Sequence, residues 1–393
     1  MQLIMHLWRA ILILHPGVEL PFNFHFDTDK YGKVVVVFVN GDEKIVADEV
    51  RITKDSMIIK MPVFDSEIDA KLDSSLVNQI TTWRGVFINH ARTKDNIIPF
   101  VAYDGWNERF MMNGKTSKAD FGGKWEVHFS KGTPDSSDAI GQFTQDGDKI
   151  TGTFLTTTGD DRYLQGNVID STLNLSCFDG MHLFLFKATM KSDGTIEGDY
   201  WSGAHWHEPW IGKRNKKYEL PDADTLMHLK QGYDNVSFSF PDADSTMISF
   251  PSDKYKGKVV ILQIMGTWCP NCMDETSYLA PFYDKNKSKG LEIIGLDFEK
   301  ATDFSKAKYN VSRLKSRFNI NYQILIAGTT RKDDIASKLP MFESIYSYPT
   351  TIFIDKKGKV RRIHTGYSGP ATGVYYDRWI DDFTSFVDKL LKE

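Results

Sequence analysis

Apolar and polar residues alternate with a period of two from about residue 6 to 212, and helical periodicity is almost absent there. Leu173, Leu175 and Cys177 share one face of such a run. Dipeptides typical of tight hairpins separate several of the runs: Asn40-Gly41, Asp146-Gly147, Asp179-Gly180 and Asp193-Gly194. The pattern predicts about a dozen short antiparallel strands, closed as a lipocalin-like barrel or folded as a sandwich.

Smaller features refine this all-β prediction. Residues 22–90 and 122–212 have a similar texture, which hints at two comparable β halves. A short helix is expected near 74–79. Residues 1–14 show no basic leader and no small-residue cleavage site, so no signal peptide is visible and the segment is expected to begin the folded domain.

The pattern changes after Arg214. Residues 213–258 are rich in Lys, Asp and Pro and resemble a connector with short β-prone pieces. Beyond it, apolar strands alternate with helical patterns, which predicts an α/β domain around a central sheet. The expected strands are 259–264, 291–296, 350–354 and 359–364, and the expected helices are 270–285, 303–317, 332–339 and 376–391. The predicted organisation is a β domain at 1–215, a connector with lead-in strands at 216–250 and an α/β domain at 251–393.

Composition narrows the functional classes. The chain has 393 residues, a net charge of −4 and three cysteines, and it is 41% hydrophobic. Domains of this size can bury a full core, so a secreted scaffold held by disulfides is excluded. The charge balance argues against a nucleic-acid partner. No run of 18 apolar residues occurs that could cross a bilayer as a helix.

Two of the cysteines form a C-x-x-C pair, Cys269 and Cys272, between a predicted buried strand and a predicted helix. The first thiol then lies over free backbone N–H groups at the positive end of the helix dipole, which favours the thiolate. Cys269 is therefore the expected nucleophile. Cys272, one helical turn further on, is the expected resolving thiol that attacks a mixed disulfide.

A C-x-x-C pair can instead be half of a zinc site, which needs two more Cys or His ligands. Outside the pair, the chain offers Cys177 in the β domain and His364 as the sole histidine of the α/β domain. Cys177 is most simply a small buried hydrophobic residue. His205 and His207 share a strand face without a recognisable third ligand, so no metal site is predicted.

Residues 250–393 resemble a thioredoxin-fold domain of the TlpA/ResA type, thiol-disulfide oxidoreductases of the bacterial cell envelope. The resemblance rests on four pieces in order: Gly257-Lys258-Val259-Val260, Gly266-Thr267-Trp268-Cys269-Pro270-Asn271-Cys272, Tyr348-Pro349-Thr350-Thr351 and Gly358-Lys359-Val360. It implies that the bond before Pro349 is a cis-proline bond and that the Tyr348–Pro349 backbone faces the cysteines and a substrate peptide. Taken alone, Pro349 would be an ordinary strand-initiating proline.

The resemblance also suggests supporting residues. Trp268, Pro270 and Asn271 form the rest of the active-site motif, and the Pro-Asn dipeptide between the cysteines would tune the reduction potential. No cofactor is implied beyond the redox-active Cys269–Cys272 disulfide itself.

The expected proton acceptor differs from the one in ordinary thioredoxins. Their buried carboxylate, six residues before the first cysteine, is replaced here by Gln263. Glu275 matches the position of an active-site glutamate in ResA-type proteins and could shuttle a proton; a solvated helix residue in a surface ion pair is an equal alternative. Glu299, at the end of a predicted strand, is a second candidate.

These observations predict an enzyme, a thiol-disulfide oxidoreductase acting as a disulfide reductase in cell redox homeostasis. The resemblance implies disulfide-containing client proteins, an electron-donor thiol-disulfide protein and a periplasmic or cell-envelope location, with membrane association only through a lipid anchor upstream. In an alternative, the β domain is the main client- or ligand-binding module; a closed barrel filled by its own side chains would reduce it to a spacer or docking surface. Peroxidase activity is a third hypothesis, although residues 262–269 lack the proline and threonine spacing of peroxiredoxins.

Overall fold

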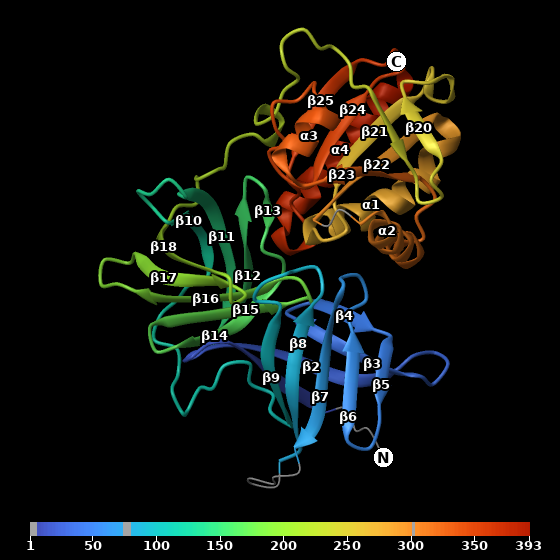
Figure 1. The fold of residues 1–393 in the computed structure, drawn as a ribbon. Helices are drawn as coiled ribbons and strands as arrows, with labels where there is room; N and C mark the ends of the chain where they lie inside the picture. Colours follow the sequence, from blue (N-terminus) through green and yellow to red (C-terminus); the bar gives the residue numbers. More distant parts are fainter. Residues whose placement is uncertain (1–5, 74–79, 301–302) are drawn as a thin grey trace. The chain divides into compact units, whose positions relative to one another are not determined.

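The computed structural model describes residues 6–73, 80–300 and 303–393, and the helix expected near 74–79 lies outside them. The chain divides into two compact units (Figure 1). The first comprises residues 1–156 and 161–219, and the second comprises residues 157–160 and 220–393. Within the described ranges, the helices all fall short of the length and apolar character needed to cross a membrane.

The first unit is built from two antiparallel sheets of nine strands each, β1–β9 and β10–β18, except that the two-residue strand β13 falls within the second unit. It therefore contains more strands than the dozen that the turn signals suggested, and the two comparable halves are visible as two sheets. The first sheet has the order β4-β3-β2-β1-β9-β8-β7-β6-β5. Its strands are β1 (Leu7–His15), β2 (Val18–Thr28), β3 (Val34–Asn40), β4 (Glu43–Ala47), β5 (Glu49–Ile52), β6 (Ser56–Lys60), β7 (Ser66–Asp73), β8 (Thr82–Asn89) and β9 (Ile97–Asp104).

The second sheet has the order β11-β10-β18-β17-β16-β15-β14-β12-β13. It closes into a ring, because β11, at one end of this order, pairs with both β10 and β12. Apart from the short β13, neighbours in this ring are consecutive in sequence, and the first and last strands, β10 and β18, pair with each other, as in an up-and-down barrel. Its strands are β10 (Gly123–Phe129), β11 (Ser137–Asp146), β12 (Lys149–Thr156), β13 (Gly159–Asp160), β14 (Leu164–Ile169), β15 (Thr172–Phe178), β16 (Leu183–Met190), β17 (Ile196–Ser202) and β18 (Trp206–Arg214).

Aromatic side chains from the barrel strands pack into one buried core. Phe154 stacks on Phe186 with ring centroids 4.4 Å apart, and Phe186 stacks on Tyr200 at the same separation. Trp125 and Trp210 are buried in the same cluster. The barrel is thus packed with its own side chains, the arrangement expected of a spacer or docking surface.

A buried arginine joins the two sheets of the first unit. The Arg109 guanidinium donates to the Ser176 carbonyl of β15 at 2.8 Å, to the Asn23 side chain of β2 at 3.2 Å and to the Val39 carbonyl of β3. Burial lowers its pKa to about 10. Because its hydrogen-bond partners are neutral amide and carbonyl groups, Arg109 satisfies buried polar groups of both sheets at once.

The second unit contains a five-stranded sheet of order β23-β22-β21-β24-β25, in which β21 runs parallel to β22 and antiparallel to β24. Its strands are β21 (Val259–Met265), β22 (Leu291–Glu299), β23 (Gln323–Thr329), β24 (Thr350–Ile354) and β25 (Val360–Thr365). The α-helices are α1 (Pro270–Asn286), α2 (Phe304–Phe318), α3 (Lys332–Lys338) and α4 (Val374–Lys392). Short 3₁₀ turns occur at η1 (Ala223–Thr225), η2 (Asp253–Tyr255), η3 (Lys287–Lys289) and η4 (Pro370–Thr372).

Local signals explain several of these boundaries. All seven residues of β21 are buried, as the continuous apolar run predicts for a central strand. The α2 helix begins after Asp303, whose carboxylate accepts the Ser305 N–H, and ends at Asn319 in the left-handed conformation. The two-domain fold class, β-rich followed by thioredoxin-like α/β, is confirmed.

Two further parts of the second unit can be compared with the sequence predictions. The edge strand β23 was missed. The segment 216–250, expected as a connector with lead-in strands, contains the hairpin of β19 (Phe238–Pro241) and β20 (Met247–Phe250), which belongs to the second unit. Phe238, Phe240 and Phe250 are buried in the same core as β21 and β22.

Candidate active site

The two cysteines of the motif meet at the start of α1, directly after β21. A disulfide joins Cys269 to Cys272 with a Cα–Cα distance of 5.2 Å. Cys269 is the N-cap residue, and its sulfur accepts the Cys272 N–H at 3.1 Å, while Pro270 occupies the first turn. Cys269 is 4% exposed and Cys272 is fully buried. The geometry places the Cys269 sulfur where a helix start stabilises negative charge, and the half-buried Asn271 completes the turn.

The loop before β24 borders Cys269. The Tyr348–Pro349 peptide bond is cis, and the Tyr348 carbonyl oxygen lies 3.4 Å from the Cys269 sulfur. The Tyr348 ring contacts the Trp268 ring edge-on, with centroids 5.3 Å apart. The Trp268 indole in turn donates to the Phe298 carbonyl of β22 at 2.8 Å. The structure therefore brings together Trp268, Cys269, Tyr348 and Pro349, although these residues come from two distant parts of the chain.

Beneath the cysteines, Gln263 and Glu275 form one buried network. The Gln263 amide donates to the Glu275 carboxylate at 2.8 Å and to the Cys272 carbonyl at 3.4 Å. The Thr351 hydroxyl of β24 donates to the other Glu275 oxygen at 2.6 Å. Gln263 thus stands where thioredoxins carry a carboxylate and holds a carboxylate supplied by α1.

Glu275 is fully buried, which excludes the alternative of a solvated helix residue in a surface ion pair. Burial raises its pKa to about 7, although the hydrogen bonds from Thr351 and Gln263 favour the charged form. A carboxyl group with this pKa can release and take up a proton near neutral pH.

A second pair of carboxyl groups lies at the end of β22. The Thr267 backbone N–H, two residues before Cys269, points at both Asp297 and Glu299 with N–O distances of 3.2 Å. The Thr267 hydroxyl also donates to Glu299. Sequence reasoning named Glu299 but missed Asp297; the signal was two acidic residues with alternate spacing at the end of an apolar strand.

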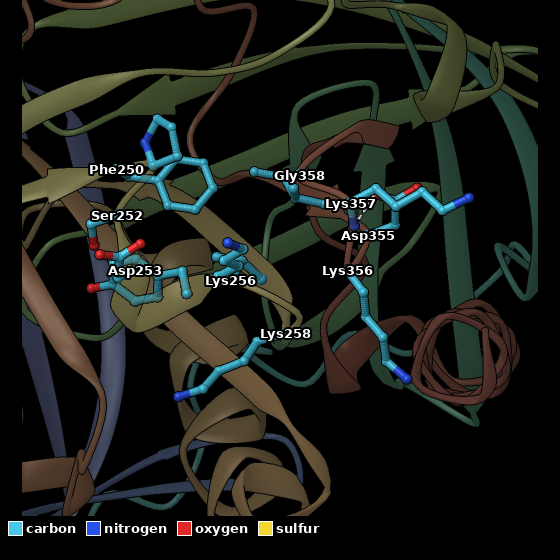
Figure 2. Close-up of a pocket in the computed structure, with 13 residues that line it drawn as sticks. Phe250, Ser252, Asp253, Lys256, Lys258, Asp355, Lys356, Lys357 and Gly358 are labelled. Atoms are coloured by element: carbon cyan, nitrogen blue, oxygen red, sulfur yellow. Dashed lines mark hydrogen bonds between the residues drawn. The ribbon is translucent and has the colours of Figure 1, made fainter.

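A pocket of about 300 Å³ lies at the other end of the sheet, lined by residues 250–253, 255, 256, 258, 260 and 354–358 (Figure 2). It adjoins the start of β21, whereas the cysteines follow the end of this seven-residue strand, about 20 Å away. Figure 2 shows the Lys258, Lys356 and Lys357 side chains pointing in different directions. The pocket is therefore separate from the redox centre and does not gather these lysines around one ligand position.

The chemistry-bearing residues of the first unit are held in structural roles. Cys177 is fully buried in the barrel core, and burial raises the pKa of its thiol well above the usual range. The His207 ring stacks on Trp201 and lies 2.9 Å from an Asp199 carboxylate oxygen.

The chain is similar to several known proteins. Residues 232–363 match the AhpC/TSA family. The chain is 30% identical over 138 residues to the thiol-disulfide oxidoreductase ResA of Bacillus subtilis, which covers 35% of this chain and 69% of that protein. It is 34% identical over 112 residues to ResA of Geobacillus thermodenitrificans, covering 28% of this chain and 57% of that protein. A thioredoxin-family thiol:disulfide interchange protein from Chlorobium tepidum matches in structure with 23% identity and a TM-score of 0.32, covering 40% of this chain and 95% of that one.

The fold and the paired cysteines define a thioredoxin-fold redox protein. The chain belongs to the ResA family of thiol-disulfide oxidoreductases. It spans just over half the length of the first relatives that it matches. Its first unit lies outside the residues that match the AhpC/TSA family.

Proposed function

We propose that this protein is a thiol-disulfide oxidoreductase that reduces disulfides in client proteins of the cell envelope. The observation that carries the proposal is the Cys269–Cys272 disulfide at the start of α1, with the Cys269 sulfur accepting a backbone N–H. This arrangement stabilises a Cys269 thiolate after reduction and leaves Cys272 one turn deeper.

The reaction consists of two thiol-disulfide exchanges. In the dithiol form, the Cys269 thiolate attacks a client disulfide, which forms a mixed disulfide and releases one client thiolate. The Cys272 thiolate then attacks the Cys269 sulfur, which restores the Cys269–Cys272 disulfide and releases the second client thiolate. The client gains two electrons and the protein loses two, so a dithiol donor protein must reduce the pair again.

Glu275 is the proposed proton acceptor for Cys272. Its carboxylate and the Cys272 carbonyl share the Gln263 amide as donor. As Cys272 turns into the attacking thiolate, a carboxyl group with a pKa of about 7 can take its proton without a large energetic cost. The Tyr348–Pro349 backbone would pair with the client peptide beside Cys269, with Trp268, Pro270 and Asn271 shaping the contact.

The expected partners follow from this chemistry. They are disulfide-containing client proteins and an electron-donor thiol-disulfide protein, with a periplasmic or cell-envelope location. The packed barrel core supports a docking or spacer role for the first unit over a role as the main ligand-binding module.

Trapping with Cys272→Ser tests the proposal. This variant should accumulate mixed disulfides on Cys269, which non-reducing gels and mass spectrometry can identify. The double variant Cys272→Ser/Cys269→Ser is the matched control and should trap nothing, whereas Cys272→Ser/Cys177→Ser should trap as well as Cys272→Ser alone. If Cys269 stays thiol-reactive but forms no mixed disulfide, the reductase proposal is wrong.

A redox titration of the pair tests the direction of electron flow. A reductase is expected to have a low reduction potential, similar to the value of about −270 mV that is typical of thioredoxin. A value near about −120 mV, typical of a strong oxidant, would overturn the assignment as a reductase. Fast oxidation of Cys269 by peroxide would favour the peroxidase alternative instead.

A further inference from the structure

Three consecutive residues before Cys269 are anchored to the end of β22. The Thr267 N–H and hydroxyl bind the Asp297 and Glu299 carboxyl groups, and the Trp268 indole binds the Phe298 carbonyl. Gly266 approaches so closely that a Cβ there would lie 2.7 Å from the Phe298 oxygen. The Cys269 N–H closes the turn by donating to the Gly266 carbonyl at 3.0 Å. The last residues of β22 thus hold the turn that precedes Cys269 in place.

The two carboxyl groups at this end of β22 are close together and shielded from water. Asp297 is fully buried and Glu299 is 5% exposed. Both accept the same Thr267 N–H, so their oxygens converge on one point. The second Asp297 oxygen, Oδ2, is buried and receives no hydrogen bond from the described residues. An ionised carboxylate in that setting would be costly, whereas a protonated Oδ2 can donate to Glu299.

Electrostatics support the same protonation. Burial, and then the charge of Glu299, raise the pKa of Asp297 well above its usual value. Two buried carboxyl groups that accept the same N–H cannot both ionise without a large cost.

We propose that Asp297 and Glu299 share a single proton and form a positioning pair that controls how readily Cys269 carries negative charge. With its proton, the pair has a charge of −1 and holds the Thr267 turn in place. Loss of the proton brings the charge to −2 behind that turn and opposes the Cys269 thiolate. The inference rests on Cys269 being the nucleophile, and it concerns a group separate from Glu275.

The position of the pair makes this coupling direct. Thr267 and Cys269 are two residues apart, which limits their Cα separation to about 7 Å. Asp297 pairs in register with Met265, which is on the same sheet face as Gln263 and therefore faces the start of α1. One extra charge at about 10 Å in a partly buried setting shifts a thiol pKa by about one unit.

Other charged and titratable groups face the pair from neighbouring elements. Tyr348 lies beside Asp297, and burial together with that carboxyl group raises the pKa of its phenol. Asp334 of α3 binds the N–H of Thr329, which pairs with Glu299 in the sheet. Lys300 lies over the Trp268 ring at 4.3 Å, and Glu275 lies on the same sheet face. Tyr348 and Asp334 cannot supply the shared proton near neutral pH, because Tyr348 stays protonated and the pKa of Asp334 is lowered.

The test is the pH dependence of iodoacetamide alkylation at Cys269 in the reduced full-length chain, measured by peptide mass spectrometry. Asp297→Asn keeps an acceptor for Thr267 and a donor for Glu299 but cannot lose a proton. Glu299→Gln removes the neighbouring charge, and burial keeps Asp297 protonated near neutral pH. Neither variant can reach the charge of −2 that the deprotonated wild-type pair carries. We expect both to lose one step of the wild-type rate–pH curve and to react about tenfold faster at a pH where the wild-type pair is ionised and the Cys269 thiol is still mostly protonated.

Glu292→Gln is the matched control, because Glu292 lies on the same strand and pairs with Lys258 far from the cysteines. It should reproduce the wild-type curve. Superimposable curves for Asp297→Asn and the wild type would overturn the inference. If that variant does not fold by circular dichroism, Glu299→Gln decides on the same criterion. The infrared spectrum of the wild type at pH 8 must also show a protonated buried carboxyl group, and its absence overturns the inference. A Cys269 that does not react at any pH would instead contradict the proposed function.

Discussion

The two units of this protein bury a cysteine in opposite ways. In the barrel, Cys177 is surrounded by apolar and aromatic side chains, and burial raises the pKa of its thiol. In the second unit, Cys269 is nearly as buried, but its sulfur accepts a backbone N–H at a helix start. Burial alone therefore does not set the chemistry of a thiol here; the donors that face the sulfur do.

Buried carboxyl groups show the same contrast. In the first unit, the pKa of Asp179 is lowered despite burial, because His182 and Arg162 face it and the Met181 N–H binds it. In the second unit, Glu275 is held by neutral donors and its pKa is raised to about 7. The first unit thus favours the charged form of its buried Asp179, whereas the second unit holds Glu275 near the point of titration.

The largest expected effect comes from removing the proposed nucleophile, Cys269. Cys269→Ala should abolish dithiol–disulfide exchange, because Cys272 is deeper and would lack its partner sulfur. Cys177→Ala should leave the rate of client disulfide reduction unchanged. A disulfide-reduction assay with a thiol donor measures both, and loss of activity in Cys177→Ala would break the contrast between the two thiols.

The next effect is on stability and belongs to the first unit. Arg109→Met fills similar space but leaves buried carbonyl and amide oxygens in both sheets without a donor. Each such group costs about 1–3 kcal/mol, so we expect the free energy of unfolding of this unit to fall by about 4 kcal/mol. Chemical denaturation followed by tryptophan fluorescence measures the loss. The reduction potential of the cysteine pair should not change, and a shift in it would contradict the separation of roles.

A smaller effect concerns the pH dependence of the second unit. The folded-state pKa of Glu275 is about 7 against an ordinary value of 4.5, so between these values the folded state binds more protons than the unfolded state. Stability from this group is therefore lost as the pH rises. Glu275→Gln should be more stable than the wild type by about 3 kcal/mol at most at pH 8 and equally stable at pH 4. Thermal unfolding at the two pH values checks this, and equal differences at both would show that Glu275 does not titrate as described.

The smallest expected effect is the structural cost of Cys177→Ala. It removes one sulfur from a packed barrel core and should cost about 1 kcal/mol, near the average for a point substitution. The midpoint of denaturant unfolding measures it. A gain in stability would indicate that the buried thiol strains the core.

The sequence predicted elements whose signals are local. The buried strand before Cys269, the N-cap position of that residue and the strand at 350–354 all follow from short apolar runs and turn residues. The edge strand β23 was missed because its short apolar run lies between two helical patterns without turn dipeptides. The number of strands in the first unit was underestimated, because several of its turns lack the Asn-Gly or Asp-Gly signal.

Only the part of the candidate site that lies in one short segment could be predicted from the sequence. Cys269 and Cys272 stand in one motif, but the approach of Tyr348 and the convergence of Asp297 on Thr267 depend on sheet register. Register is a long-range property that no short segment encodes. The burial of Glu275 also depends on its contacts with β21 and β24. The sequence alone therefore could not distinguish a proton shuttle from a solvated helix residue.

The β19–β20 hairpin determines where a stable fragment of the second unit can begin. Asp242 of the turn after β19 forms a bridge with Leu325 of β23, the outer strand of the five-stranded sheet. Exposed strand edges invite pairing between molecules, and natural proteins cover them. A fragment that starts at residue 251 would lose this cover and expose an apolar edge, so it should aggregate. A fragment that starts near residue 220 would keep the hairpin and should stay monodisperse.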